Sequence, residues 1–103
     1  MEKQIKICSV SGFTSMLGGK WKLIIIIDRL RKREMLRFGF LAASIDNISR
    51  KVLSDQLKEL VEDNLVIRKQ FNEIPPRVEY SLTEKGKSLC DVFKSIDKWM
   101  NVK

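Results

Sequence analysis

Residues 48–61 read ISRKVLSDQLKELV, and the periodicity of this stretch decides the fold. Its apolar residues recur at the i, i+4, i+7, i+8 spacing of one buried helix face: Leu53, Leu57, Leu60 and Val61. Ser49 is placed to cap the first turn. Asn64 stands where a helix often ends on a left-handed residue. The pattern predicts a helix from about Ser49 to Glu62 with one buried face and a basic, exposed N-terminal turn.

Downstream of this helix, two extended segments flank a proline loop. Residues 65–71 and 77–82 predict the strands of a hairpin, and the adjacent Pro75 and Pro76 belong in its loop because proline cannot donate to a ladder. Thr83 is then expected to cap a final helix. One face of that helix carries an apolar stripe: Leu89, Val92, Phe93, Ile96, Trp99 and Met100. The stripe either packs on the core of its own chain or forms an interface with a second copy.

Upstream, the chain is expected to be helical. Residues 9–17 predict a short helix that Gly18 and Gly19 end, and a second helix can begin at Lys20. The run LIIII at 23–27 favours a strand by propensity, but its apolar neighbours recur at helical spacing and favour a buried helix: Trp21, Leu23, Ile24, Ile27 and Leu30. A short helix over 37–44 and a turn at 45–47 complete this part.

The resulting order is four helices, two strands and a helix. It predicts an α+β, mostly helical fold, a winged helix-turn-helix, in one domain that spans residues 1–103. The helix-turn-helix covers about 37–62, the two-stranded wing about 65–82 and a C-terminal dimerisation helix about 84–101. We expect the N-terminal helix to take part in dimerisation as well.

The charge of the chain is strongly positive and uneven. Twenty Lys and Arg face thirteen Asp and Glu in 103 residues, which gives +7 and a pI near 9.7. Such a charge serves either solubility or the binding of a polyanion. An exposed helix fits the major groove, and phosphate contacts supply much of the affinity. The candidate DNA contacts lie before and on the central helix and on the hairpin: Arg37, Ser49, Arg50, Lys51, Ser54, Arg68, Lys69 and Arg77.

Several functions are excluded by composition. The chain has no histidine, which removes imidazole-based acid–base catalysis and imidazole zinc sites. Its two cysteines, Cys8 and Cys90, are too far apart for a C-x-x-C motif. We therefore expect no catalytic residue, no metal and no cofactor, and hence no enzyme. The longest apolar run is far shorter than a membrane span, and the cysteine usage suggests a reducing, cytoplasmic setting.

Three stretches and one cysteine together resemble the HxlR-type transcriptional regulators, relatives of the MarR group. The stretches are LGGKW at 17–21, ISRKVLSDQL at 48–57 and PPRVEYSLTEKG at 75–86, and Cys8 sits where many members carry an N-terminal cysteine. The resemblance runs from about Cys8 to Trp99. It implies a homodimeric, sequence-specific DNA-binding regulator of bacterial type on a pseudo-palindromic operator, responsive to a small molecule or an oxidant.

Some positions depart from the family pattern. Glu34-Met35 replace the usual Gly-Pro turn, and Gly39-Phe40 replace a polar residue and an acid. Cys8 is either a redox sensor or an inert thiol, and Cys90 is expected to be buried. The alternative function is a winged-helix module that contacts a protein or an RNA.

Overall fold

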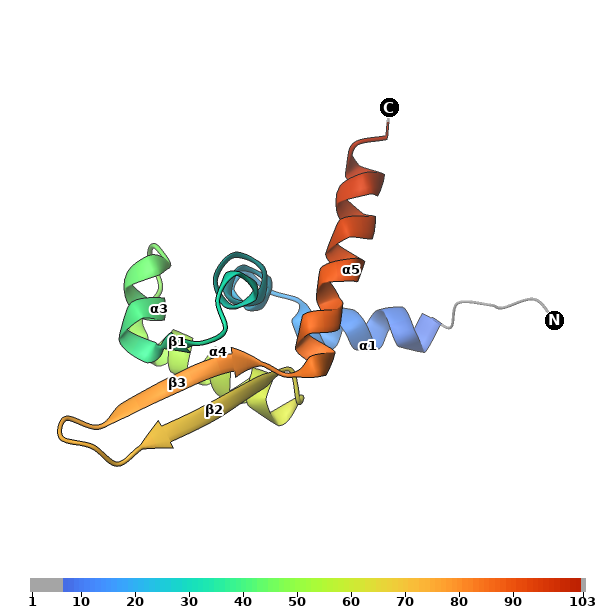
Figure 1. Ribbon diagram of the computed structural model, residues 1–103. Helices are drawn as coiled ribbons and strands as arrows, with labels where there is room; N and C mark the ends of the chain where they lie inside the picture. Colours follow the sequence, from blue (N-terminus) through green and yellow to red (C-terminus); the bar gives the residue numbers. More distant parts are fainter. Residues whose placement is uncertain (1–6, 103) are drawn as a thin grey trace.

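The computed structural model describes residues 7–102, which form helices and a small antiparallel sheet (Figure 1). The chain begins with α1 (Ile7–Leu17) and α2 (Lys22–Ile24), followed by a π-helical turn η1 (Ile25–Arg29) and a 3₁₀ turn η2 (Leu30–Lys32). Next come β1 (Leu36–Arg37), α3 (Phe38–Ser44) and α4 (Arg50–Glu62). The hairpin of β2 (Val66–Phe71) and β3 (Arg77–Leu82) leads into α5 (Glu84–Met100).

The sheet has three strands in the order β1-β3-β2, all antiparallel. The predicted hairpin is confirmed: Val66 pairs with Leu82 at its base and Phe71 with Arg77 near its tip. The prediction of two strands was incomplete, because Leu36 and Arg37 pair with Tyr80 and Glu79 on the outer edge of β3. A two-residue strand has no alternation of polar and apolar residues, so it leaves no periodic signal in the sequence.

The central helix α4 is built as its sequence predicts. The Ser49 hydroxyl accepts a hydrogen bond of 3.0 Å from the backbone N–H of Val52 and caps the first turn. Leu53, Leu57 and Leu60 are fully buried on the inner face. Left-handed asparagines lie in the turns on either side, Asn47 with φ of 65° and Asn64 with φ of 61°.

The isoleucine-rich segment is helical, as predicted, but its inner face differs from the predicted one. Ile25, Ile26 and Leu30 are fully buried, whereas Ile24 and Ile27 are only half-buried. The π-helical turn η1 accommodates one more residue per turn than an α-helix, so it rotates the following side chains relative to a 3.6-residue pattern. A face drawn at ordinary helical spacing therefore selects the wrong isoleucines.

The two terminal helices extend away from the sheet in different directions (Figure 1). Gly18 and Gly19 end α1, and Gly19 has a φ of 100°, which favours glycine. The Thr83 hydroxyl caps α5 by accepting a 3.0 Å hydrogen bond from the N–H of Gly86. A side chain at Gly86 would collide with the carbonyl oxygen of Leu65, because a Cβ there would lie 2.2 Å from it.

Within residues 7–102, no single helix is long and apolar enough to cross a membrane. The segments Ser9–Leu17 and Lys22–Lys32 reach that length and composition only as a pair, and they are bent by 82° relative to each other.

Candidate nucleic-acid interface

An arginine of η1 is bonded to the C-terminal end of α3. Arg29 reaches from η1 to the end of α3, where its Nη2 donates to the Ser44 carbonyl at 2.7 Å and its Nε donates to the Ser44 hydroxyl at 3.1 Å. The carbonyls at a helix C-terminus carry partial negative charge, so a guanidinium stabilises this end of α3. Arg29 is thus used inside the fold and fixes the turn that leads to α4.

The N-terminal turn of α4 presents two exposed cations. The Arg50 guanidinium lies 5.5 Å from the ring centroid of Phe38 on α3, an arrangement typical of a cation–π contact. The Lys51 ammonium lies 3.1 Å from the Asp55 carboxylate one turn later, and both side chains are mostly exposed. A pair so exposed contributes little and opens easily. Both cations therefore remain available to a ligand at this end of the helix.

A hollow of about 580 Å³ lies between α3, α4 and the hairpin. Ser54 of α4, Arg37 of β1 and Arg68 of β2 line it, and all three are exposed. Phe40 also lines it and is 58% exposed, with the Arg33 guanidinium 5.9 Å from its ring. The exposed Phe40 that the sequence singled out as a departure thus lies on the same face as the predicted DNA contacts.

The two cations of β2 lie on opposite faces of the hairpin, as strand geometry requires. Arg68 pairs with Tyr80 and shares a hollow with Ser54 and Lys58 of α4, so it faces the helix. Lys69 pairs with Glu79, and its ammonium lies 5.3 Å from the ring of Phe71. Both side chains are exposed, and neither makes an ion pair within the described part of the chain.

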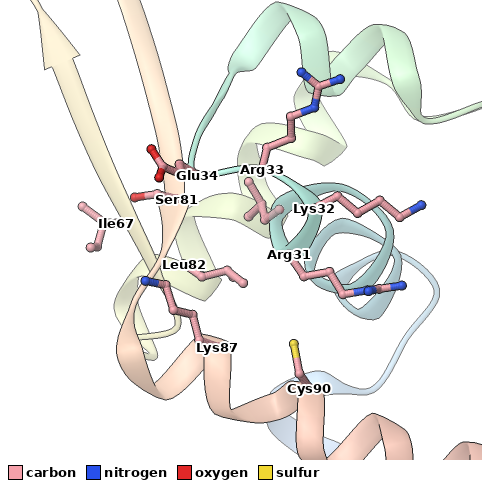
Figure 2. A pocket seen from close by; sticks show the side chains of 10 residues that line it. Arg31, Lys32, Arg33, Glu34, Ile67, Ser81, Leu82, Lys87 and Cys90 are labelled. Atoms are coloured by element: carbon pink, nitrogen blue, oxygen red, sulfur yellow. The ribbon is translucent and has the colours of Figure 1, made fainter.

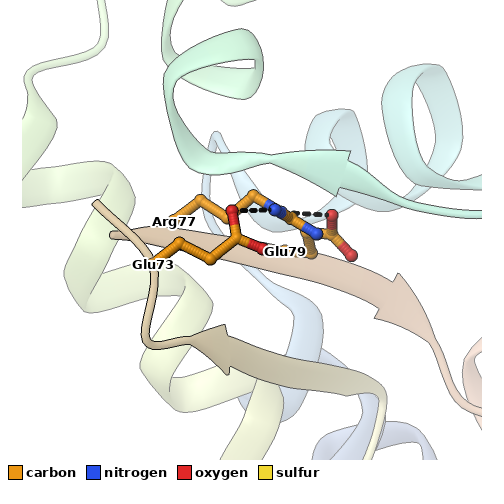
Figure 3. A network of polar contacts seen from close by, with 3 residues as sticks. All are labelled: Glu73, Arg77 and Glu79. Atoms are coloured by element: carbon orange, nitrogen blue, oxygen red, sulfur yellow. Dashed lines mark hydrogen bonds and ion pairs between the residues drawn. The ribbon is translucent and has the colours of Figure 1, made fainter. Parts of the chain in front are cut away.

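Arg77 is held by two carboxylates at the end of the hairpin (Figure 3). Its Nε donates to Glu79 at 3.0 Å, its Nη1 pairs with Glu73, and its guanidinium lies 4.0 Å from the ring centroid of Phe71. The hydrogen bond to Glu79, together with the pairing to Glu73, raises the pKa of Arg77 above its ordinary value. The sequence placed Arg77 at the wing; Glu79 follows two residues later on the same face of β3, whereas the loop of the hairpin brings Glu73 near.

A buried lysine connects α4 to the N-terminal helix, a role that was not predicted from the sequence. The Lys22 side chain is 7% exposed, and its ammonium lies 2.7 Å from the Glu59 carboxylate of α4. The same ammonium donates to the Met16 carbonyl in the last turn of α1 at 3.0 Å. A lysine within an apolar segment, next to a tryptophan, is the only signal in the sequence that could have indicated such a role.

The apolar stripe of α5 becomes more exposed toward the C-terminus. Leu89 is buried against the core and Phe93 is half-buried. The distal residues are far more accessible, with exposed fractions of 45% for Ile96, 73% for Trp99 and 66% for Met100, and Val92 on the same stripe is 40% exposed. Packing on the chain's own core therefore accounts only for the first half of the stripe.

The two cysteines lie in different helices, Cys8 in α1 and Cys90 in α5. Cys8 belongs to α1, and its side chain lies outside the residues whose side chains are described. Cys90 is half-buried rather than buried, because one side of it borders a cleft beside α5. Among residues 7–102, no group of three His, Cys, Asp or Glu side chains lies close enough to hold a metal ion.

Comparison with known proteins agrees with this geometry. Residues 16–103 match the model of the family described as HxlR-like helix-turn-helix. A protein of Fusobacterium mortiferum named for a regulatory role, MalR, is 46% identical over 92 residues, which cover 89% of this chain and 86% of that protein.

Solved structures resemble the whole fold. A chain from Enterococcus faecalis V583, assigned to the MarR family of transcriptional regulators, superimposes with a TM-score of 0.83 at 40% identity, covering 96% of this chain and 88% of that one. The redox regulator HypR in its reduced form superimposes with a TM-score of 0.79 at 33% identity, covering 88% of each chain. The resemblance inferred from the motifs is confirmed, and with it the prediction that the protein is no enzyme: the chain belongs to the HxlR-like helix-turn-helix family of DNA-binding transcriptional regulators.

Proposed function

We propose that the protein is a homodimeric regulator that binds a pseudo-palindromic operator sequence-specifically, with α4 in the major groove and the β2–β3 hairpin beside it as the wing. The observation that carries this proposal is the exposed, cationic N-terminal turn of α4, flanked by the exposed Arg37 and Arg68. The N-terminal residues of a recognition helix are those that contact base edges in this motif. Helix-turn-helix, wing and C-terminal helix would together form one domain.

The proposed contacts divide by role. Arg50, Ser54 and Lys51 would contact bases and phosphates from α4, while Arg37, Arg68 and Lys69 would contact phosphates. The Ser49 hydroxyl already caps α4, so its proposed contact would use the remaining lone pair or the hydroxyl proton. Arg77 would act by holding the wing in shape, since two carboxylates and an aromatic ring already engage its guanidinium.

The proposed dimer uses the apolar stripe of α5, whose distal part is the exposed one. Leu89, Val92, Phe93, Ile96, Trp99 and Met100 would form the interface, with α1 of the partner against it. A contiguous exposed apolar surface of this kind marks an interaction site, and two-fold symmetry suits two operator half-sites about one DNA turn apart. Trp99→Asp should shift sedimentation toward the monomer, whereas Lys98→Asp, one residue away on the same helix, should not.

DNA binding is tested by the dependence of operator affinity on salt. Each phosphate that a cation neutralises adds roughly −0.9 to the slope of log K against log salt. Arg50→Ala/Lys51→Ala should therefore weaken binding and reduce the magnitude of the slope by up to about 4 in a homodimer. The control Lys94→Ala/Lys98→Ala removes the same charge from α5. If the α4 variant is folded and binds as tightly as the wild type, α4 does not read the operator.

A slope near zero on duplex DNA would instead favour a winged helix that contacts a protein or RNA. A response to oxidants is proposed for Cys8, because HypR is a redox regulator of the same fold; a small-molecule effector is the other option. Cys8→Ser should abolish any change of operator affinity on oxidation and any disulfide-linked dimer on non-reducing electrophoresis. If the Cys8→Ser variant keeps the affinity change and the disulfide-linked dimer, Cys8 is not the redox sensor.

A further inference from the structure

A cleft of about 550 Å³ lies between η2, the base of the hairpin and the first half of α5 (Figure 2). Its floor is apolar, with Leu30 and Leu82 buried and Ile67 partly exposed. Its polar lining comes from three separate parts of the chain: Arg31, Lys32, Arg33, Glu34, Ser81, Lys87 and Cys90. The volume lies within the range of small-molecule sites.

Part of the cleft lies on the face of the hairpin opposite the one that packs toward α4. Side chains alternate across a sheet, and the pair Arg68–Tyr80 faces α4. The adjacent pair Ile67–Ser81 lines the cleft and therefore lies on the opposite face of the hairpin. The cleft lies at the base of the hairpin, which follows the C-terminal end of α4, so an operator bound to the N-terminal turn of α4 does not account for its cations.

The charge of the cleft is unbalanced. Four cationic residues and one acidic residue, Glu34, line it, although the Arg33 guanidinium lies 5.9 Å from the Phe40 ring. Within residues 7–102 the side chains of Arg31 and Lys32 make no ion pair, and Lys87 lies 3.8 Å from Glu84, whose side chain is 94% exposed. So exposed a pair is weak.

Two of these cations lie on either side of the Cys90 thiol (Figure 2). In Figure 2 the Arg31 guanidinium and the Lys87 ammonium lie on opposite sides of the Cys90 thiol, whereas Arg33 extends away toward α3. A ligand between Arg31 and Lys87 would meet one cation on each side and the apolar floor beneath.

We propose that this cleft binds a small organic anion that carries two or more acidic groups. A guanidinium and an ammonium on opposite walls match two carboxylates or phosphates, and the Ser81 hydroxyl can donate a further hydrogen bond. The apolar floor favours a carbon skeleton over a bare inorganic ion, because Leu30, Leu82 and Ile67 offer it no polar partner. A single acidic group would leave one of the two cations uncompensated.

Such a ligand would connect α5 to the base of the wing. The walls of the cleft belong to α5, to β3 and to the segment that leads into β1. A bound ligand would therefore favour one placement of α5 relative to the hairpin. A ligand shifts such an equilibrium only as far as its affinities for the two arrangements differ. This regulatory consequence rests on the proposed function, whereas the binding itself does not.

The binding is tested without DNA, through the thiol at the edge of the cleft. In Cys8→Ser the remaining cysteine is Cys90, and its rate of alkylation by N-ethylmaleimide is measured with phthalate or citrate present. Benzoate at the same ionic strength is the matched monoanion. The site variant is Arg31→Gln/Lys87→Gln, and the control is Lys85→Gln/Lys98→Gln, which removes two cations from α5 outside the cleft. Isothermal titration with phthalate and citrate measures binding directly.

We expect phthalate or citrate to slow alkylation at least threefold relative to benzoate, the control to keep this protection and the site variant to lose it. The proposal is overturned if neither phthalate nor citrate binds more tightly than benzoate, or if the site variant and the control variant are protected to the same extent. It is also overturned if a duplex operator protects Cys90 as well as the anions do, since the cations would then belong to the DNA interface. A failure of operator binding alone would refute the proposed function and leave the anion site standing.

Discussion

The ion pair between Lys22 and Glu59 predicts an asymmetry between its two partners. The Lys22 side chain is 7% exposed and that of Glu59 is 51% exposed. Removing the lysine leaves a carboxylate that water can solvate, whereas removing the glutamate leaves a buried ammonium with the Met16 carbonyl as its remaining partner. Loss of the acid should therefore destabilise the protein more than loss of the base.

The magnitudes follow from this difference in burial. Lys22→Met keeps most of the side-chain volume and loses the cap on α1, which should cost about 1 kcal/mol. Glu59→Ala leaves an uncompensated buried charge and should cost about 3 kcal/mol, at the low end for such pairs because half of the Glu59 side chain is already in water. The double variant should resemble Lys22→Met, because it contains no buried charge.

Urea unfolding at a fixed protein concentration measures these costs. With a slope of roughly 1–3 kcal/mol per molar urea, the two single variants should differ in midpoint by about 1 M. The reasoning is refuted if Lys22→Met is the less stable of the two, or if the double variant is less stable than Glu59→Ala. Glu62→Ala, an exposed acid one turn later on α4, is the control and should change the midpoint little.

Substitutions at five further positions test other parts of the fold and of the interface. Gly86→Ala should cost about 2 kcal/mol or more despite its gain in helix propensity, because its Cβ would collide with the Leu65 carbonyl; thermal unfolding measures this. Asn64→Gly should be nearly neutral and Asn64→Ala should lose about 1 kcal/mol, since φ there is 61°. Ser49→Ala should remove about 1 kcal/mol of stability with the cap. Arg77→Gln should weaken operator binding and leave the slope of log K against log salt unchanged, whereas Arg68→Gln should reduce the magnitude of that slope. An equal reduction in both variants would show that both arginines contact phosphate directly.

Much of the fold could be predicted because strong local signals agree with it. The leucine spacing of α4, its serine cap and the asparagines at its ends each specify the same helix, and the hairpin follows from its proline loop. The features that escaped prediction have no local signal. The strand β1 is two residues long, and the π-helical turn changes which isoleucines are buried without changing the composition.

The candidate interface could be predicted by position but not by partner. Arg50 and Lys51 are at the start of α4 because the helix begins there, and periodicity reveals this. Arg77 and Glu79 share one face of β3 by strand alternation, which spacing does indicate, but Glu73 approaches only because the hairpin turns between them. The contact with Glu73 depends on the conformation of the hairpin loop, which composition and spacing do not determine.

The position of each cation within the fold, and not the net charge of +7, determines what it can bind. Arg29 fixes the end of α3, Lys22 connects α1 to α4, and Arg77 is held at the end of the hairpin. These three contribute to the pI as fully as any other, yet each is already engaged inside the protein. The cations left for partners lie in two regions, one around the N-terminal turn of α4 and the hairpin and one beside α5 at the base of the hairpin. A single polyanion surface would place them together, so their separation favours two different anionic ligands, duplex DNA in the first region and a small organic anion in the second.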